Sequence, residues 1–372
     1  MIMTEYPLVS ITVCVRDGVE WIDSCLESLV NQDWPNIEVI AVDDGSCDGS
    51  RELLQKWHDP DAQQHSCSVR ILSQAPLGLS AGRMNAVNET KGKWVAITDI
   101  DVRPEETWIS QLMDARNPID DVEKVVAVTG RTIFEGGTNI VSRLRSAEIS
   151  AKYRSRPRRT SLANGPCSIF LKQALLDCGG FNPEWDHAED MEVSLRLISE
   201  GGNIVYTPDA VVNHVAEDSL FKFLTKRTRD ARAHVRIVRH FPRKKWSGPN
   251  FDFIGSSWAV LAMFPLQLLQ LLMIARLVNW GTAGFELSID AVEMMLDSLY
   301  FCVGLLAFFI NHGLRFFYGP HRSLGVSIWQ PMKMAKIYKV VNLWGFALWK
   351  GLALGYLDAL FGRNGHRKTK EK

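Results

Sequence analysis

Two carboxylates lie two residues apart, directly after an apolar run. The run is 95–97, and the carboxylates are Asp99 and Asp101. Such a run predicts a buried strand, and in an open α/β sheet ligands bind at the carboxyl ends of the strands. Two carboxylates with one spacer can share a hard divalent cation, which can in turn hold a diphosphate. Because Asp-x-Asp is also common in solvated turns, the pair alone leaves both interpretations open.

A second acidic pair, Glu189 and Asp190, opens a predicted helix over 188–198. Carboxylates are stabilised at this end of a helix dipole, so capping explains the pair without any catalytic role. A carboxylate that faces a reacting hydroxyl could instead serve as its general base. Periodicity does not distinguish these two interpretations.

Strands and helices alternate through the first half of the chain. The apolar runs predict strands at 9–15, 37–42, 69–72, 93–97, 125–129 and 168–171. Helices are predicted after the first three strands, which implies an α/β fold with a mostly parallel sheet and right-handed crossovers. No Gly-x-Gly-x-x-Gly follows the first strand, which argues against a dinucleotide-binding fold. Residues 134–165 show no clear pattern, and two short extended pieces are predicted at 204–207 and 210–214.

Composition excludes several classes of protein. The chain has 42 basic and 42 acidic residues, and we find no basic sheet interleaved with aromatics and no groove-reading helix, so nucleic acid is not an expected partner. Its seven cysteines form no Cys-x-x-Cys, which argues against a zinc site or a disulfide framework and suits a reducing compartment. The N-terminus shows neither the basic nor the apolar region of a secretory signal.

The last third of the chain predicts membrane association. Residues 253–275 carry no charge and are long enough to span a bilayer, and 298–314 form a second candidate span. A third apolar stretch, 340–361, contains Lys350 and Asp358, which favours an interfacial or re-entrant segment. Lysine and arginine follow the second span and fill the tail, so residues 1–252 and the tail are expected on the cytoplasmic side of the cell membrane.

Taken together, the motifs resemble those of the family 2 glycosyltransferases with the GT-A fold. The resemblance covers about residues 8–216 and implies transfer of a sugar from a nucleotide diphosphate. Its pieces are Val42-Asp-Asp-Gly-Ser-Cys-Asp-Gly49, Gly78-Leu-Ser-Ala-Gly-Arg83, Thr98-Asp-Ile-Asp101, Gly179-Gly-Phe181, Glu189-Asp190 with Leu195-Arg-Leu197, and Tyr206-Thr-Pro-Asp-Ala-Val-Val-Asn-His214.

The resemblance assigns a donor side to the site. It implies that Asp43 accepts from the imide N–H of a uracil-type base, with Asp44 and Asp17 nearby. It also implies that Arg83 lies near the diphosphate, whose oxygens a guanidinium complements. The residue after Arg83 departs from the family pattern, which often has Asn where this chain has Met84.

The resemblance also assigns a metal and a base. Asp99 and Asp101 would hold the cation, with Asp99 also on the nucleotide-sugar, and His214 would complete the metal shell. Such a mixed oxygen and nitrogen set suits Mn²⁺, with Mg²⁺ as the alternative. Asp190 would be the general base of an inverting transfer, and Glu189 would orient the acceptor or the base.

A basic segment precedes the first predicted span. Residues 222–245 hold ten Lys/Arg against one acid, and four arginines recur at helical spacing: Arg229, Arg232, Arg236 and Arg239. One interpretation is a face for anionic lipid headgroups or a lipid pyrophosphate acceptor, and the other is a solvated flank of the membrane.

These observations predict a GT-A catalytic domain at 1–220, a basic juxtamembrane region at 221–252, two membrane helices within 253–314 and a basic cytoplasmic segment at 315–372. The expected activity is metal-dependent transfer from a nucleotide-sugar, a uridine one by the resemblance, to a lipid-linked or cell-surface glycan precursor. Membrane lipids are the other expected partner. The alternatives are transfer to a polyprenyl phosphate and a catalytically silent GT-A scaffold at the membrane.

Overall fold

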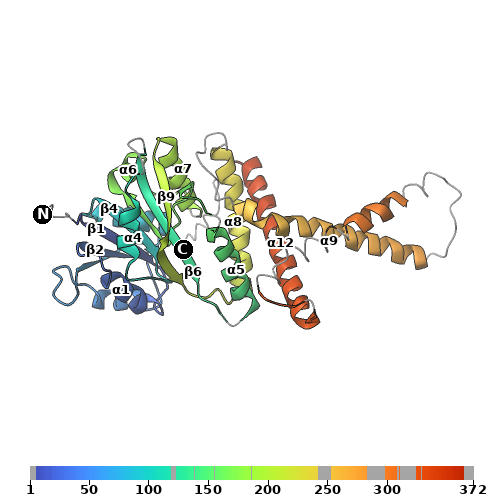
Figure 1. Ribbon diagram of the computed structural model, residues 1–372, viewed down its shortest axis with the longest axis horizontal. Helices are drawn as coiled ribbons and strands as arrows, with labels where there is room; N and C mark the ends of the chain where they lie inside the picture. Colours follow the sequence, from blue (N-terminus) through green and yellow to red (C-terminus); the bar gives the residue numbers. More distant parts are fainter. Residues whose placement is uncertain are drawn as a thin grey trace.

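The computed structural model describes residues 6–118, 123–137, 139–154, 156–185, 187–241, 253–282, 298–307, 310, 324–327 and 329–363. A sheet with helices on both faces forms one end of the molecule, and the C-terminal helices extend from it (Figure 1). The predicted α/β organisation is confirmed. The predictions for residues 1–5, 242–252, 283–297, 311–323 and 364–372 concern parts of the chain outside the described residues.

Within the described residues the sheet has nine strands, in the order β3-β2-β1-β4-β8-β6-β9-β5, and β7 pairs with β9. The first four strands are parallel, β8 is antiparallel to both neighbours, and β6 is parallel to β9. The strands are β1 Val9–Val15, β2 Ile37–Asp43, β3 Ser68–Ser73, β4 Trp94–Asp99, β5 Val102–Pro104, β6 Val125–Phe134, β7 Arg159–Thr160, β8 Ser168–Leu171 and β9 Asn203–His214.

The two short extended pieces predicted at 204–207 and 210–214 belong to one strand, β9. The pairing of β9 with β6 shifts register here. Thr129 pairs with Tyr206, but Arg131, only two residues later in β6, pairs with Val211. This irregularity carries Thr207, Pro208 and Asp209, which is why the sequence reads as two pieces.

Helices cover both faces of the sheet. One core cluster joins the sheet to α1 and α4, and a second joins it to α3, α6 and α7. The sequence pattern did not reveal α5, which occupies part of the unassigned region. The helices of this part are α1 Ile22–Val30, α2 Ser50–Lys56, α3 Leu79–Glu89, α4 Trp108–Ala115, α5 Ile140–Arg154, α6 Lys172–Asp177 and α7 Glu189–Ser199.

A third core lies among the C-terminal helices. Helix α8, Leu220–His240, lies side by side with α12, Pro331–Leu360, and α9, Phe253–Thr282, projects away from the sheet (Figure 1). Buried side chains of α5, α8 and α12 meet with the early part of α9 in one cluster: Val141, Leu144, Phe223, Ala231, Val260, Ile337, Val341, Trp344 and Leu348 are members. Helices α5 and α8 therefore connect the sheet to the C-terminal helices through a packed interior.

The contact between α8 and α12 combines close backbone approach with a charge pair. A side chain at Gly351 or Gly355 would overlap backbone atoms of α8. Arg232 forms a two-pronged ion pair with Asp358, which is 7% exposed. The acidic residue that makes 340–361 a poor membrane span is thus neutralised by α8.

The row of arginines predicted on α8 is used in different ways. Arg232 pairs with Asp358, while Arg236 donates to the Glu184 carbonyl at 2.9 Å and lies 3.9 Å from the Trp185 ring centroid. Arg229 and Arg239 are exposed. The helix is confirmed as far as residue 240, but two of its four arginines hold the protein together rather than facing a ligand.

Among the described residues, one helix, α12, is long and apolar enough to cross a membrane, although 44% of its most apolar window is buried inside the protein. The apolar stretches Val260–Ala275 and Ser298–Ala307 are shorter than that criterion requires. Helix α12 thus includes most of 340–361, the stretch for which the sequence favoured an interfacial or re-entrant position. The two predicted spans remain predictions, and 298–314 lies only partly within the described residues.

Replacement of Gly351 with alanine tests the α8–α12 contact. Its Cβ would lie 2.3 Å from the Thr228 carbonyl oxygen, so we expect the free energy of unfolding to fall by about 1–3 kcal/mol. Helix propensity alone would raise it by about 1 kcal/mol, so the sign of the change is diagnostic. Thermal or denaturant unfolding measures it, with Gly136→Ala as the control because nothing lies within 4 Å of a Cβ there. A stabilised Gly351→Ala variant would contradict the packing.

Candidate active site

Strand register brings the predicted site residues to one edge of the sheet. Asp43 ends β2 opposite Val15, and Asp99 ends β4 opposite Cys14, so the two acids flank the end of β1. Farther along, β5 pairs with β9 so that Val102 lies opposite His214, which brings His214 beside Asp101. The antiparallel pairing of β5 with β9 thus brings a residue from the end of the domain next to the end of β4.

Arg83 is the buried cation at the centre of this edge. Its side chain projects from α3 and is 2% exposed; Nη1 lies 2.6 Å from Glu189 Oε1 and Nη2 lies 2.8 Å from Asp99 Oδ1. Burial alone would lower the pKa of Arg83. The carboxylates of Glu189 and Asp99 raise that pKa by more than burial lowers it, so the guanidinium stays charged. One guanidinium therefore joins Asp99, at the end of β4, to the acid pair that opens α7.

The predicted role of Arg83 near a diphosphate stays a prediction. Both terminal nitrogens of Arg83 are engaged by carboxylates, and the side chain is enclosed. Its neighbour Met84, where the family often has Asn, packs on the backbone of Gly180. In this structure α3 contributes an organising cation and a packing side chain to the site.

The surroundings of Asp190 raise the pKa of its carboxyl group. Burial first, and the charge of Glu189 second, raise the pKa of Asp190 to about 6. Its Oδ2 accepts from the Gly165 backbone at 3.1 Å and its Oδ1 from the Met191 backbone at 2.8 Å. Ala188, with φ at 59°, turns the chain into α7 so that both acids enter the site. A carboxylate with this pKa can exchange a proton near neutral pH.

Asp101 and His214 face each other across a gap that suits a cation. His214 Nε2 lies 3.4 Å from Asp101 Oδ2, and Nδ1 lies 2.9 Å from the Val215 carbonyl oxygen. Since a carbonyl only accepts, Nδ1 carries a proton, and in a neutral ring Nε2 then directs a lone pair toward the carboxylate. Such an arrangement is typical of a histidine whose outer nitrogen is held for metal binding. Phe134 stacks on the ring at 4.3 Å.

These two residues fit a divalent ion as a partial shell. No group of three or more His, Cys, Asp or Glu side chains that could hold a metal occurs among the described residues. Asp99 gives one oxygen to Arg83, and its side chain is 30% exposed. Mn²⁺ and Mg²⁺ are commonly bound by one or two protein ligands with substrate phosphates completing the shell, which matches what this edge offers.

The three acids predicted around the nucleotide have different surroundings. Burial would raise the pKa of Asp43, but hydrogen bonds from Ser46 and from Arg51, at 2.8 Å, outweigh it and lower the pKa. Asp44 accepts from the backbones of Leu77 and Gly78, at 2.8 and 2.9 Å, and so fixes the loop before α3.

Asp17 borders the same loop with a backbone φ of 51°. Its Oδ1 accepts from the Cys47 backbone at 2.8 Å, and its own N–H donates to Ser46. Asp17 and Asp44 thus shape the loops on either side of Asp43.

Two features of the site escaped the sequence patterns. The Gly165 backbone that supports Asp190 comes from a loop between β7 and β8, for which no motif gives a signal. His187, three residues before Asp190, bonds Asp230 of α8 at 2.6 Å. Its closeness in sequence to Glu189 and Asp190 was the one available signal. Through this contact α8 holds the loop that carries the acid pair.

Residues 10–179 match the model of the family described as Glycosyl transferase family 2. This matched segment, which is less than half of the chain, is similar to a family 2 glycosyltransferase domain. Helix α7, with Glu189 and Asp190, and strand β9, with His214, follow the matched region and complete the same sheet edge.

Curated relatives match parts of this chain. EpsH of Bacillus subtilis is 29% identical over 154 residues, which cover 41% of each protein. The cholesterol galactosyltransferase of Borreliella burgdorferi is 36% identical over 104 residues, 28% of each. The chondroitin synthase of Pasteurella multocida is 24% identical over 250 residues, 66% of this chain and 24% of that one. The chain spans less than half the length of each of these relatives.

A solved structure shares the fold over nearly the whole chain. It is the mannosyltransferase PcManGT of Pyrobaculum calidifontis, described in complex with GDP-Man and Mn²⁺, with a TM-score of 0.56 and 17% identity. The similarity covers 96% of this chain and 88% of that one. The predicted GT-A fold is therefore confirmed.

Loss of Arg83 tests the organising role of its guanidinium. In Arg83→Met two carboxylates lose their partner, and we expect the free energy of unfolding to fall by about 3 kcal/mol, with partly exposed Asp99 moderating the loss. Arg83→Lys keeps the charge but cannot bridge both acids, so stability should recover in part. Denaturant unfolding gives these values. Arg159→Met, at an exposed arginine 4.0 Å from Glu123, is the control with a change below about 1 kcal/mol. Equal effects at both arginines would contradict the assignment.

Proposed function

We propose that the protein is a metal-dependent inverting glycosyltransferase. It moves a sugar from a nucleotide diphosphate, for which a uridine nucleotide is the expected carrier, to a hydroxyl group of a lipid-linked or cell-surface glycan precursor. The observation that supports the proposal is the ion-paired row Asp99–Arg83–Glu189, which joins the acid at the end of β4 to the acid pair that opens α7, where half-buried Asp190 follows Glu189.

Asp190 is the proposed general base. An inverting transfer needs a carboxylate that takes the proton of the acceptor hydroxyl as that oxygen attacks the sugar carbon. A pKa near 6 leaves Asp190 ionised at neutral pH while keeping it basic enough to accept the proton. Glu189, ion-paired with Arg83, then orients the acceptor or the base.

The leaving-group side is assigned to the other acids. Asp43 faces the nucleobase and the ribose of the donor. Asp101 and His214 would hold Mn²⁺ or Mg²⁺ together with phosphate oxygens. When bound, the ion neutralises the charge that develops on the departing diphosphate. The presence of GDP-Man and Mn²⁺ in the PcManGT structure supports this assignment.

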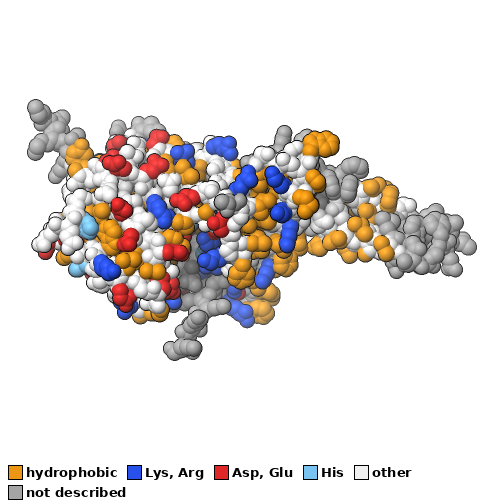
Figure 2. Space-filling view, turned by 90° about the horizontal axis from the view of Figure 1, so that it is seen from below, with side chains coloured by type: hydrophobic (Ala, Val, Ile, Leu, Met, Phe, Trp, Pro, Cys, Tyr) orange, Lys and Arg blue, Asp and Glu red, His pale blue; other side chains and the backbone are white. Residues whose placement is uncertain are grey.

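The C-terminal helices are the proposed membrane-associated part. Large apolar side chains are exposed along the outer half of α9, on the helix 298–307 and on α12, including Leu272, Val278, Tyr300, Leu306, Trp349 and Leu360. Figure 2 shows apolar side chains over the helical half beside a band of lysine and arginine. Exposed Lys333, Lys336 and Lys339 on α12 suit anionic headgroups at the cytoplasmic face, with membrane lipids as partners.

The pH dependence of transfer tests the role of Asp190. Because its pKa is raised to about 6, the carboxyl is protonated below that pH, and we expect kcat to fall about tenfold for each pH unit below it. Asp190→Asn should lose at least 10²-fold in kcat. The assay is release of nucleotide diphosphate from a panel of nucleotide-sugars. Activity that survives in Asp190→Asn would favour transfer to a polyprenyl phosphate, whose anionic oxygen needs no base.

Stability separates loss of the base from loss of the fold. A raised carboxyl pKa means that the folded state binds a proton more tightly than the unfolded one, so this contribution to stability is lost as pH rises through about 6. Asp190→Asn removes that dependence. We therefore expect the variant to gain stability relative to wild type at pH 7.5 compared with pH 5. If instead it unfolds at pH 7.5, its inactivity says nothing about the base.

The metal requirement tests the Asp101–His214 pair. His214→Ala removes the nitrogen ligand, and we expect the Mn²⁺ concentration for half-maximal activity to rise at least about 10-fold. Titration of Mn²⁺ into chelator-treated protein measures it, with Arg239→Gln on α8 as a control. An unchanged Mn²⁺ requirement would remove His214 from the metal shell, and unchanged function of Asp101→Ala in cells would favour the silent scaffold.

A further inference from the structure

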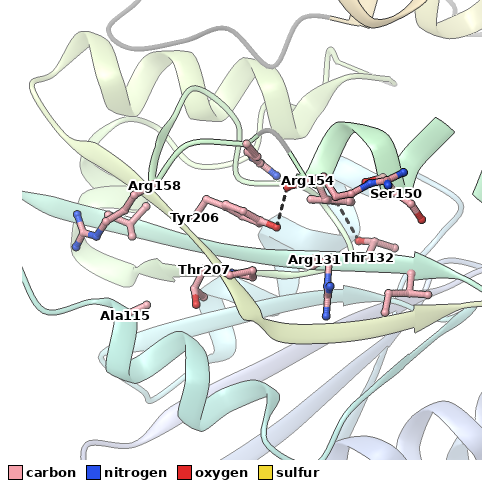
Figure 3. A pocket seen from close by; sticks show the side chains of 13 residues that line it. Ala115, Arg131, Thr132, Ser150, Arg154, Arg158, Tyr206 and Thr207 are labelled. Atoms are coloured by element: carbon pink, nitrogen blue, oxygen red, sulfur yellow. Dashed lines mark hydrogen bonds between the residues drawn. The ribbon is translucent and has the colours of Figure 1, made fainter. Parts of the chain in front are cut away.

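A cleft that contains none of the site residues above lies against the middle of β6 and β9. Its volume is about 730 Å³, within the range of small-molecule and cofactor sites. Strand β6, the irregular part of β9, the end of α5 and the segment after α5 form its walls (Figure 3). The register shift between β6 and β9 falls at this wall, which includes Thr207 and Pro208.

The lining of this cleft is strongly basic. It includes four arginines and no acidic side chain: Arg131, Arg154, Arg156 and Arg158. Arg158 is ion-paired with Glu123 at 2.7 Å, and Arg154 is exposed. The Nε atom of Arg131 is buried and has no hydrogen-bond partner among the described residues. Such a concentration of cations in a hollow attracts an anion, which would bond the guanidinium groups.

Arg156 anchors the inner wall. It is 8% exposed, donates to Thr160 and to the Leu162 carbonyl, and its guanidinium lies over the rings of Tyr153 and Tyr206, at 5.6 and 5.0 Å. Burial lowers the pKa of Arg156, and nearby groups, among them the Asp190 carboxylate, oppose that shift only in part. The positive charge is therefore built into the cleft and is not only a property of exposed side chains.

The remaining lining is suited to a hydroxyl-rich ligand. Ser150, Thr132 and Thr207 contribute hydroxyl groups, which can both donate and accept, and Ile133, Val205 and Pro208 provide apolar surface. Figure 3 shows Arg131, Thr132 and Thr207 along the strands and Ser150 and Arg154 on the helix side. A saccharide that carries an acidic group combines the chemistry that these two kinds of lining recognise.

The cleft is connected to the catalytic acid by a short path. The Tyr153 hydroxyl accepts from the Asn164 side chain at 3.0 Å, and the next residue, Gly165, donates its N–H to Asp190. A ligand against Tyr153 and Arg156 would therefore lie behind the segment that supports the proposed base.

We propose that this cleft is a second binding site, which takes an anionic saccharide: sugar units that bear phosphate or carboxylate groups within the acceptor or product chain. The choice of a saccharide over other anions rests on the proposed function. The arginines bind the acidic groups, and the hydroxyl side chains bind those of the sugar. The site holds part of the glycan away from the transfer centre.

Binding without donor tests this site separately from catalysis. Calorimetry on the purified full-length protein uses tetragalacturonic acid as the anionic probe, with maltotetraose and inorganic phosphate for comparison. We expect the anionic tetrasaccharide to bind more tightly than either. Arg131→Gln and Arg154→Gln should each weaken its binding about 10-fold, since each removes a charge-assisted hydrogen bond. Arg239→Gln, an exposed arginine on α8, is the matched control and should change nothing.

The outcomes separate this inference from the proposed function. Equal affinity for the neutral tetrasaccharide, unchanged binding in both arginine variants, or competition by a nucleoside diphosphate would overturn the second site. Phosphate that binds as tightly as the tetrasaccharide would overturn its assignment to a saccharide. Loss of probe binding with intact sugar transfer rejects the cleft alone, whereas probe binding in a protein that transfers no sugar rejects only the transferase proposal.

Discussion

The buried guanidinium of Arg83 is the constraint on which the site depends. An ion enclosed to this degree is tolerated only when its partners neutralise it, and here they come from β4 and from the start of α7. The strand end that carries Asp99 and the helix start that carries Glu189 and Asp190 are thereby held on one cation. The same charge limits the rise in the pKa of Asp190, which burial and Glu189 cause.

The sequence predicted the parts of this arrangement that depend on local pattern. Apolar runs located the strands of the first half, and the acids at 43, 99 and 101 lie at the strand ends where they were expected. Asp44 shows the limit of such reasoning: the motif predicts that it lies beside the nucleotide, but the motif does not reveal that its oxygens accept from the backbone at 77–78. Which acid of a pair faces the ligand is decided by tertiary contacts that one strand's pattern does not contain.

The longer-range features could not be predicted for a related reason. Helix α5 carries arginine, serine and glutamate on much of its surface, because several of its charges are neutralised by one another and by α8 rather than by water. Its weak apolar periodicity therefore hid it. In the same way, the sequence indicated only that Asp358 interrupts an apolar stretch. In the structure Arg232 pairs with it across the α8–α12 contact. Buried ion pairs make apolar periodicity a poor guide wherever two charged helices pack together.

Helix α8 connects the catalytic loop to the C-terminal helices. Asp230 contacts His187 on one side and Arg227 on the other, at 2.6 and 2.8 Å, and one turn away the glycines of α12 lie against the backbone. Burial would raise the pKa of Asp230, but Arg227 and His187 lower it, so it remains an anion. Because α8 contacts both the loop before Asp190 and α12, it links the position of that loop to the position of α12. The basic helix is therefore better explained as the joint between the apolar helices and the active site than as a surface that binds a ligand.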